Sequence, residues 1–288
     1  MESDGGKRVI VVSFSGGRTS ARMSKKLLDT SSKKPLYIFA NTGQEKEETL
    51  EFVDRCDKDW GLDVVWVEAV IHHKHGIGTT HRVVNFETAC RDGRLFEDMI
   101  IQYGIPNKAY PHCTRELKLA PIYSYLKAVK LKDFQMAIGL RADERGRAIS
   151  LEDRGNIIYP LIDTWPMKKS VVIDWWRKQD FDLNIQEFEG NCTWCWKKSM
   201  KKHFALIESQ PEIFSFTRVM EKKYPLAGSN EDGTPRVFFR GGMSTDDLFD
   251  IYQEEQKANP RFAFDCDDGC SDSCDIHAIM AVEKCGGF

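Results

Sequence analysis

The sequence lacks the long hydrophobic runs that membrane proteins carry. Its apolar stretches are short, such as Val9–Val12, whereas a membrane-spanning helix needs about 20 apolar residues. The N-terminal residues Met1–Asp4 also lack the basic start and the apolar stretch of a secretory signal. These absences argue against a membrane protein, and we expect a cytoplasmic location.

An excess of charge of one sign is also missing. The 41 Lys and Arg residues are balanced by 44 Asp and Glu residues, so the formal net charge is -3. This balance excludes a protein that coats nucleic acid by bulk positive charge, and any polyanion would have to meet a local basic patch.

The cysteines do not suit a disulfide framework. Their number is nine, which is odd, and disulfides are rare in cytoplasmic proteins. They are also unevenly spaced, because Cys192 and Cys195 form a CxxC pair and four others crowd the end of the chain. Metal binding or redox chemistry is therefore the expected use of cysteine.

The remaining composition is that of an ordinary globular protein. Hydrophobic residues make up 41% of the chain and charged residues 30%, and the mean hydropathy is -0.45. A length of 288 residues allows two small domains or one large α/β domain with an appendage.

Strand patterns alternate with helical patterns in the first 170 residues. Strands are predicted at residues 8–14, 36–40, 62–67, 134–140 and 157–161, and the first two helices at residues 19–28 and 45–60. This alternation predicts an α/β fold with a doubly wound parallel sheet of Rossmann-like type, in which the ligand lies beyond the carboxyl ends of the strands.

Only helical patterns follow after about residue 171. They cover residues 171–178, 196–208, 211–223 and 245–256. We therefore predict a nucleotide-binding α/β domain over residues 1–170, a helical subdomain with the CxxC pair over 171–260 and a Cys-rich tail over 261–288.

The segment Ser15–Ser20 is the clearest candidate binding site. It follows the first predicted strand and opens a helix. Gly16 and Gly17 let an anion approach the backbone closely, and the helix N-terminus adds the positive end of its dipole. An ordinary strand-to-helix turn is the alternative, but the position after the first strand of a doubly wound sheet favours a phosphate or pyrophosphate site. The spacing is not that of the common GxxxxGK[ST] loop.

The Ser-Gly-Gly turn is similar to the PP-loop of the adenine-nucleotide hydrolase superfamily. Four further segments resemble the phosphoadenosine phosphosulfate (PAPS) reductase branch of that superfamily, in the order of the family: Phe39–Glu45, Pro111–Lys118, Gly139–Arg145 and Tyr159–Leu161. The resemblance covers roughly residues 8–200 and is closest to phage and prophage members. It implies a PP-loop fold and an adenine nucleotide as ligand, either ATP or a sulfonucleotide such as PAPS or adenylyl sulfate.

The resemblance also implies a role for each matching position. Phosphates would be held by Ser15, Gly16, Gly17, Arg18, Thr19 and Ser20, and the adenine and ribose would be walled by Phe39, Asn41, Thr42 and Gly43. Gly139, Leu140 and Arg141 would close over the nucleotide, and Arg141 and Arg145 would be catalytic contacts to phosphate or sulfate. Pyrophosphatase members have Asp at the position of Thr19, so this residue bears on whether magnesium assists ATP cleavage.

A second constellation consists of Cys113, Cys192 and Cys195. A CxxC pair can place two thiolates on one metal, and an iron–sulfur cluster normally takes four ligands. The layout resembles that of assimilatory adenylyl-sulfate reductases, which implies an iron–sulfur cluster of the 4Fe-4S type on these three cysteines. The fourth ligand is left open between His112, Cys266, Cys270, Cys274 and no protein ligand. A structural zinc and plain buried thiols are the alternatives.

Two enzyme hypotheses differ in the role that they give to Cys285. It resembles the nucleophilic cysteine near the end of sulfonucleotide reductases. In the hypothesis we favour, ATP activates an oxygen of a nucleic acid or small acceptor by adenylation, and sulfur from the cluster or a cysteine replaces it. In the alternative, the thiolate of Cys285 attacks PAPS or adenylyl sulfate, and sulfite is released with a thioredoxin-type reductant as partner. A non-catalytic nucleotide-binding module of a phage or defence assembly is the third hypothesis, and a homodimer is a candidate assembly for all three.

Overall fold

The computed structural model describes residues 8–258 except 75, 191 and 229–232. Six strands form one sheet in the order β4-β3-β2-β1-β5-β6. Their bounds are β1 Val9–Ser13, β2 Leu36–Asn41, β3 Val65–Ile71, β4 Thr79–Val84, β5 Phe134–Ile138 and β6 Ile157–Ile158. Every neighbouring pair is parallel except β3 and β4. The predicted α/β class with a doubly wound sheet is confirmed.

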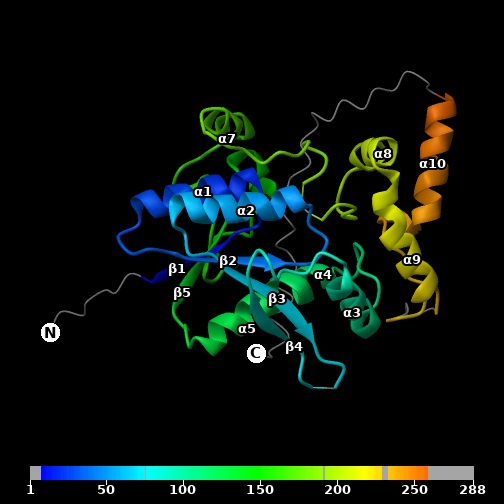
Figure 1. Ribbon diagram of the computed structural model, residues 1–288, viewed down its shortest axis with the longest axis horizontal. Coiled ribbons are helices and arrows are strands. Elements are labelled where there is room, and N and C mark those ends of the chain that lie inside the picture. The colour runs from blue at the N-terminus through cyan, green and yellow to red at the C-terminus, as the bar shows by residue number, and fades with distance from the viewer. Residues whose placement is uncertain (1–7, 75, 191, 229–232, 259–288) are drawn as a thin grey trace.

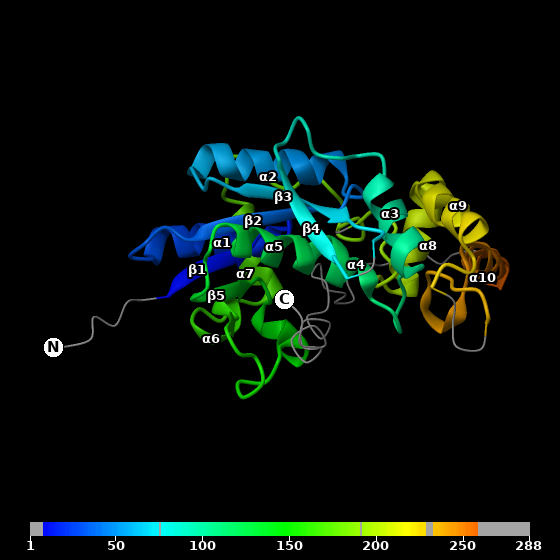
Figure 2. The same cartoon turned by 90° about the horizontal axis from the view of Figure 1, so that it is seen from below.

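Helices lie on both faces of this sheet (Figure 1). Helices α1 (Arg18–Thr30), α2 (Glu47–Trp60) and α7 (Lys169–Trp176) lie on one face, and α5 (Ala120–Ala128) lies on the other. The remaining α-helices are α3 Arg94–Tyr103, α4 His112–Thr114, α6 Pro160–Asp163, α8 Met200–Ser209, α9 Ser215–Lys223 and α10 Thr245–Ala258. Of these, α8, α9 and α10 form a group beside the sheet (Figures 1 and 2).

The described core consists of three hydrophobic clusters. One lies between the sheet and α1, α2 and α7, and one lies between the sheet and α5. The third joins α3 to the CxxC segment and to α8, α9 and α10. Val172 and Trp176 of α7 belong to the first of these clusters, so this helix packs on the sheet layer although it follows the predicted domain boundary. Within the described residues, every helix is too short or too polar to span a membrane.

Strand β4 is an element that the sequence pattern does not reveal. It pairs antiparallel with β3 at the edge of the sheet, where Ala69 lies opposite His81. The histidines around this hairpin suggest a surface loop from sequence alone, but His81 is part of the strand and its ring contacts the Ser124 hydroxyl of α5 at 2.8 Å. Polar residues are tolerated in β4 because an edge strand is covered on one side only.

The order of the strands determines where a ligand can bind. The direction of winding reverses at β1, which has β2 on one side and β5 on the other. In open α/β sheets, ligands bind beyond the carboxyl ends of the strands at this reversal point. The residues that follow β1, β2 and β5 are therefore the first candidates for a functional site.

Candidate functional site

The loop after β1 leads directly into an uncapped helix. Gly16 has a φ of 77°, a left-handed conformation that suits glycine, and Gly17 is the N-cap of α1 with no side-chain capping hydrogen bond. The Ser15 and Ser20 hydroxyls lie 3.0 Å apart and keep the loop closed. The first-turn N–H groups of α1 therefore lack a capping side chain, and such a helix end favours an anion.

The end of β5 lies against this loop. A Cβ atom on Gly139 would approach the Ser20 Cα to 2.9 Å, so only glycine allows this contact without a shift of the backbone. Just beyond it, Arg141 Nη1 donates to the Thr19 hydroxyl at 3.4 Å. The structure thus brings together two predicted parts of the nucleotide site, and the fully buried Leu140 anchors the turn between them.

The two predicted arginines differ in their surroundings. Arg141 is only 5% exposed, and its guanidinium pairs with Asp143 at 3.2 Å and Glu144 at 3.4 Å. Arg145 is exposed, and its guanidinium has no ion-pair partner among the described residues. Arg141 is therefore suited to shaping the turn, whereas Arg145 carries an uncompensated charge that could reach an anion.

The side chains at the end of β2 are mostly engaged within the protein. Phe39 is buried and packs edge-on against Trp66, with ring centroids 4.7 Å apart. The Asn41 amide donates to Glu68 at 2.6 Å and to the Cys90 carbonyl at 2.9 Å, and its oxygen accepts from the Gly43 N–H at 3.2 Å. The Thr42 hydroxyl donates to Glu45 at 2.8 Å. Contacts from this segment to a nucleotide would thus come mainly from its backbone.

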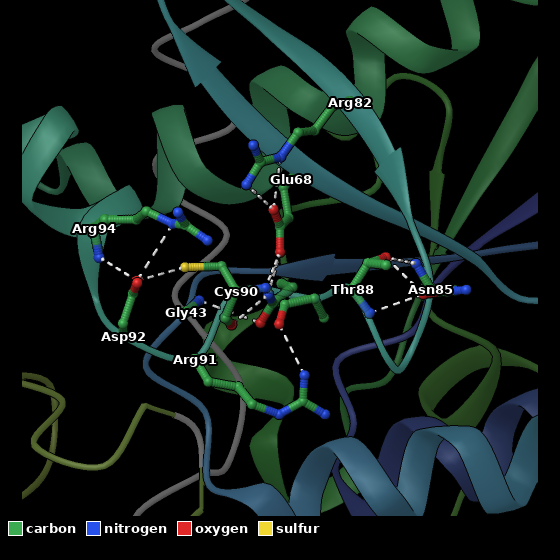
Figure 3. Close-up of polar contacts among 11 residues, drawn as sticks. Gly43, Glu68, Arg82, Asn85, Thr88, Cys90, Arg91, Asp92 and Arg94 are labelled. Carbon is green, nitrogen blue, oxygen red and sulfur yellow. Dashed lines mark hydrogen bonds and ion pairs between the residues drawn. The ribbon is translucent and has the colours of Figure 1, made fainter.

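Glu68 and Cys90 organise this edge of the sheet, and sequence analysis missed both. Glu68 is fully buried, and besides Asn41 it accepts from the Cys90 N–H at 2.6 Å and from Arg82 at 2.6 Å (Figure 3). The Cys90 thiol donates to Asp92 at 3.0 Å and lies next to Gly43, where a Cβ atom would be 3.1 Å from the sulfur. A glutamate inside the apolar run Val65–Ile71 was the signal that could have revealed this network.

Residues 182–190 and 192–196 include contacts to the segments that follow β1 and β2. The side chain of Arg18, a residue predicted to hold phosphate, pairs with Asp182 at 2.7 Å and also donates to the Leu183 carbonyl. Farther along, Lys46 pairs with Glu189 at 2.5 Å. We call residues 182–190 the cover segment. The cavity between it, the Ser15–Arg18 loop and Thr49 is about 20 Å³, which is room for about one water molecule.

The CxxC pair lies next to the end of β2. The Thr193 N–H donates to the Gln44 carbonyl at 3.0 Å, and Trp194 Nε1 donates to the Gln44 side chain at 2.6 Å. These contacts bring the Cys192 sulfur to 3.4 Å from the Thr42 hydroxyl. A predicted nucleotide residue and a predicted cysteine ligand are therefore in direct contact, although 150 positions separate them in the sequence.

The three predicted cluster ligands share a neighbourhood but do not form a metal site as they stand. Cys113, Cys192 and Cys195 are buried in the same hydrophobic cluster, which also contains Cys90. Within the part of the chain that the structure describes, no three His, Cys, Asp or Glu side chains are grouped closely enough to hold a metal ion. An iron–sulfur cluster therefore does not fit this arrangement without movement of the thiols.

The structure describes one of the four residues considered as the fourth ligand of the predicted iron–sulfur cluster. Both ring nitrogens of His112 face guanidinium groups, with Arg115 and Arg236 each at 3.3 Å. Burial and these two cations lower the His112 pKa to about 4. His112 is thus a neutral acceptor already engaged by arginines. The tail cysteines Cys266, Cys270, Cys274 and Cys285 lie outside the described residues.

Comparisons with known proteins match the chain to one family model and to several relatives. Residues 9–152 match the phosphoadenosine phosphosulfate reductase domain. The chain is 31% identical over 280 residues to the nin region protein ORF290 of Escherichia phage lambda, which covers 92% of this chain and 94% of the relative. It is 25% identical over 243 residues to a protein of Methanocaldococcus jannaschii, covering 80% of this chain and 51% of that protein.

A solved structure from the same archaeon aligns with lower similarity. It is described as a predicted subunit of a tRNA methyltransferase, and the TM-score is 0.34 at 15% identity, covering 82% of this chain and 100% of the other. The matched family domain contains the β1 loop, the end of β2 and the Gly139–Arg145 turn. The phage relative extends the similarity through the CxxC segment and the helices that follow it.

Proposed function

The chain belongs to the phosphoadenosine phosphosulfate reductase domain family, and we propose on this premise that it is an enzyme that uses a bound adenine nucleotide for sulfur transfer. The observation that carries the proposal is the 3.4 Å contact between the Cys192 sulfur and the Thr42 hydroxyl at the carboxyl end of β2. A thiol beside the expected nucleotide position is what a reaction that joins nucleotide activation to sulfur chemistry requires.

Nucleotide binding is supported by the loop after β1. The uncapped N-terminus of α1 offers N–H donors and the positive end of the helix dipole to a phosphate chain. Gly17 is extended, with a φ of -94°, and a Cβ atom there would meet only the Ser15 hydroxyl, at 3.8 Å. A Cβ atom at Gly17 therefore meets no clash, and a phosphate would reach this turn once the cover segment, which leaves a cavity of only about 20 Å³ here, moves away. Magnesium would enter with ATP, because Thr19 offers a hydroxyl rather than a carboxylate.

The proposed reaction has two stages. In the first, an acceptor oxygen attacks the α-phosphorus of ATP, the bond to the bridging oxygen of the β-phosphate breaks, and pyrophosphate leaves. In the second, a persulfide on Cys192, loaded by an external persulfide donor, attacks the acceptor carbon, and AMP leaves with the oxygen. The Cys195 thiolate then cleaves the resulting disulfide, which leaves sulfur on the acceptor. A thioredoxin-type dithiol reduces the Cys192–Cys195 disulfide that remains.

Binding of an iron–sulfur cluster by Cys113, Cys192 and Cys195 is a separate part of the proposal. It is supported by the burial of the three cysteine side chains in one apolar cluster and by the CxxC spacing. Cys192 and Cys195 cannot ligate a cluster while they carry the persulfide and the disulfide, so the reaction above would take place in protein without the cluster.

Substitution of Gly17 tests the nucleotide part of the proposal. Gly17→Val keeps an allowed backbone conformation and meets open space, so the protein should fold normally. The added methyl groups would occupy the position of a phosphate, and we expect at least a tenfold loss of ATP affinity in calorimetry, together with loss of pyrophosphate release. The control is an unchanged melting temperature. Full ATP affinity in this variant would contradict the assignment of the loop.

A further inference from the structure

A large groove lies on the face of the sheet opposite α1 and α2. Its volume is about 1050 Å³, and its walls are the hairpin between β3 and β4 on one side and α5 on the other. Figure 2 shows β4 and α5 side by side, and the 2.8 Å contact between His81 and Ser124 joins them. This volume is at the upper end of the range for small-molecule pockets, so the groove has room for several linked units.

The charged residues that line the groove are all basic. Lys74 lies on the hairpin, and Lys127, Lys130 and Lys132 lie at the end of α5. All four are exposed, and no described carboxylate pairs with any of them or lines the groove. Asp133 lies between two lining residues in the sequence, but it pairs with Arg8 at 2.9 Å outside the groove. A local basic patch thus exists on a chain whose net charge is -3.

The end of α5 gathers three of these lysines in one turn. The Lys130 N–H donates to the Lys127 carbonyl and the Leu131 N–H to the Leu126 carbonyl, both at 3.0 Å, which closes the helix. Lys130 takes the left-handed position with a φ of 58°, where glycine is the usual residue. A cation therefore occupies a position at which backbone geometry favours a residue without a side chain.

Apolar and aromatic side chains separate the lysines. Leu126, Leu131 and Phe134 line the groove beneath Lys127 and Lys132, and the Tyr123 ring lies 6.3 Å from the Phe134 ring. Ile77 on the hairpin is 49% exposed. Single-stranded nucleic acids bind to this combination, because phosphates pair with cations along the groove while bases pack on flat apolar surfaces.

We propose that this groove binds single-stranded nucleic acid, with the four lysines as phosphate contacts. The lysines would attract the phosphate backbone of the nucleic acid. The apolar side chains would favour a strand with unpaired bases over a polyanion that has no bases. Binding here does not rest on the proposed nucleotide chemistry, because none of the lining residues belongs to the β1 loop or to the CxxC segment.

Fluorescence anisotropy with the full-length protein tests the proposal. The probes are a labelled 12-nucleotide single strand, the matching duplex and inorganic polyphosphate of similar charge. We expect the single strand to bind most tightly. The double variant Lys127→Glu and Lys130→Glu should lose at least tenfold in affinity at moderate salt. The matched control, Lys33→Glu and Lys178→Glu, changes the net charge equally at exposed lysines outside the groove and should stay within about twofold.

The salt dependence gives a second readout. Neutralising Lys74 and Lys132 to Ala should lower the slope of log affinity against log salt by about 0.7 for each lost phosphate contact. Gly17→Val should bind the strand normally even if it loses ATP, so the two proposals can fail separately. Absence of strand binding, equal losses in the groove and control variants, or equal binding of polyphosphate or duplex would each overturn the proposal.

Discussion

At the residue scale, the environment of each cysteine separates candidate functional thiols from structural ones. Cys56 is buried among α2 residues, and burial raises its pKa well above the usual range of a thiol. Cys192 is also buried, but its sulfur lies 3.4 Å from the Thr42 hydroxyl at the carboxyl end of β2. A thiol in an apolar core is inert, whereas one at a polar edge can ligate a metal or react.

This difference supplies a matched pair of variants for the iron–sulfur proposal. We expect protein purified without oxygen to contain iron and acid-labile sulfide, and Cys192→Ser to lose most of both. Cys56→Ser should keep the iron and sulfide, because the Cys56 side chain packs in the hydrophobic cluster between the sheet and α1, α2 and α7, which contains none of the three proposed ligands. Iron, sulfide and zinc analyses of the three proteins provide the measurement. Stoichiometric zinc without iron would rule the cluster out.

At the element scale, α8 carries a buried imidazole that makes stability depend on pH. His203 is 2% exposed, and both ring nitrogens lack a hydrogen-bond partner among the described residues. Burial, assisted by the charges of Lys198 and Arg240, lowers its pKa to about 3. The folded protein therefore keeps His203 neutral in mild acid, whereas the unfolded chain takes up a proton below its usual pKa of about 6.5.

The sign of the effect follows from this difference in protonation. The part of the stability that His203 controls is present above the unfolded pKa of about 6.5 and is lost as the pH falls towards the folded pKa of about 3. Within this window one differing proton changes the free energy of unfolding by about 1.4 kcal/mol per pH unit. We expect His203→Leu to remove about 2 kcal/mol of the loss between pH 7.5 and pH 5, as measured by urea unfolding. His73→Leu replaces an exposed imidazole and serves as the control. Equal acid sensitivity in all three proteins would contradict the assignment.

Sequence patterns predicted the elements whose local signals are strong. The apolar run before Ser15 and the glycines after it predicted β1, the loop and α1 to within two residues at most boundaries. Strand β4 escaped prediction because its polar side chains hide the alternation of an edge strand. The π-helix at Arg115–Leu119, inside the Pro111–Lys118 segment, also has no pattern that distinguishes it from an α-helix.

The site was predictable only in part, because long-range contacts complete it. Ser15–Ser20 and Gly139–Arg141 were found from sequence, and the structure brings them together. The pairing of Arg18 with Asp182 could not be foreseen, since no local pattern links residues so far apart. This pair fastens the cover segment to the β1 loop, and the role of Arg18 in holding phosphate remains a prediction.

At the scale of the whole molecule, the CxxC segment joins the sheet to the helical group. The side chains of this segment, Cys192, Trp194 and Cys195, belong to the hydrophobic cluster that contains residues of α8, α9 and α10. Its backbone pairs with the segment after β2, where Cys192 forms a bridge with Glu45. The division into domains at residues 170 and 260 remains a prediction. The β1 loop and the thiols nevertheless lie at the same edge of the sheet, as the proposed active site requires.

An activity assay on the whole protein distinguishes sulfur transfer from sulfonucleotide reduction. Under our proposal Cys285 has no role, so the intact protein and Cys285→Ser should release no more sulfite from PAPS or adenylyl sulfate than a blank with thioredoxin present. The Gly17→Val variant serves as a control for nucleotide binding. Robust sulfite release that disappears in Cys285→Ser would identify a reductase and reject the transfer mechanism.

The ion pairs that fasten the cover segment have a consequence for the timing of catalysis. The cavity of about 20 Å³ beneath the segment is far too small for an adenine nucleotide. For a nucleotide to reach the loop from that side, the Arg18–Asp182 contact and the buried Lys46–Glu189 pair have to break first. Entry would then be a two-step process, and its rate would level off at high ATP concentration at the rate of opening, instead of rising in proportion to the concentration.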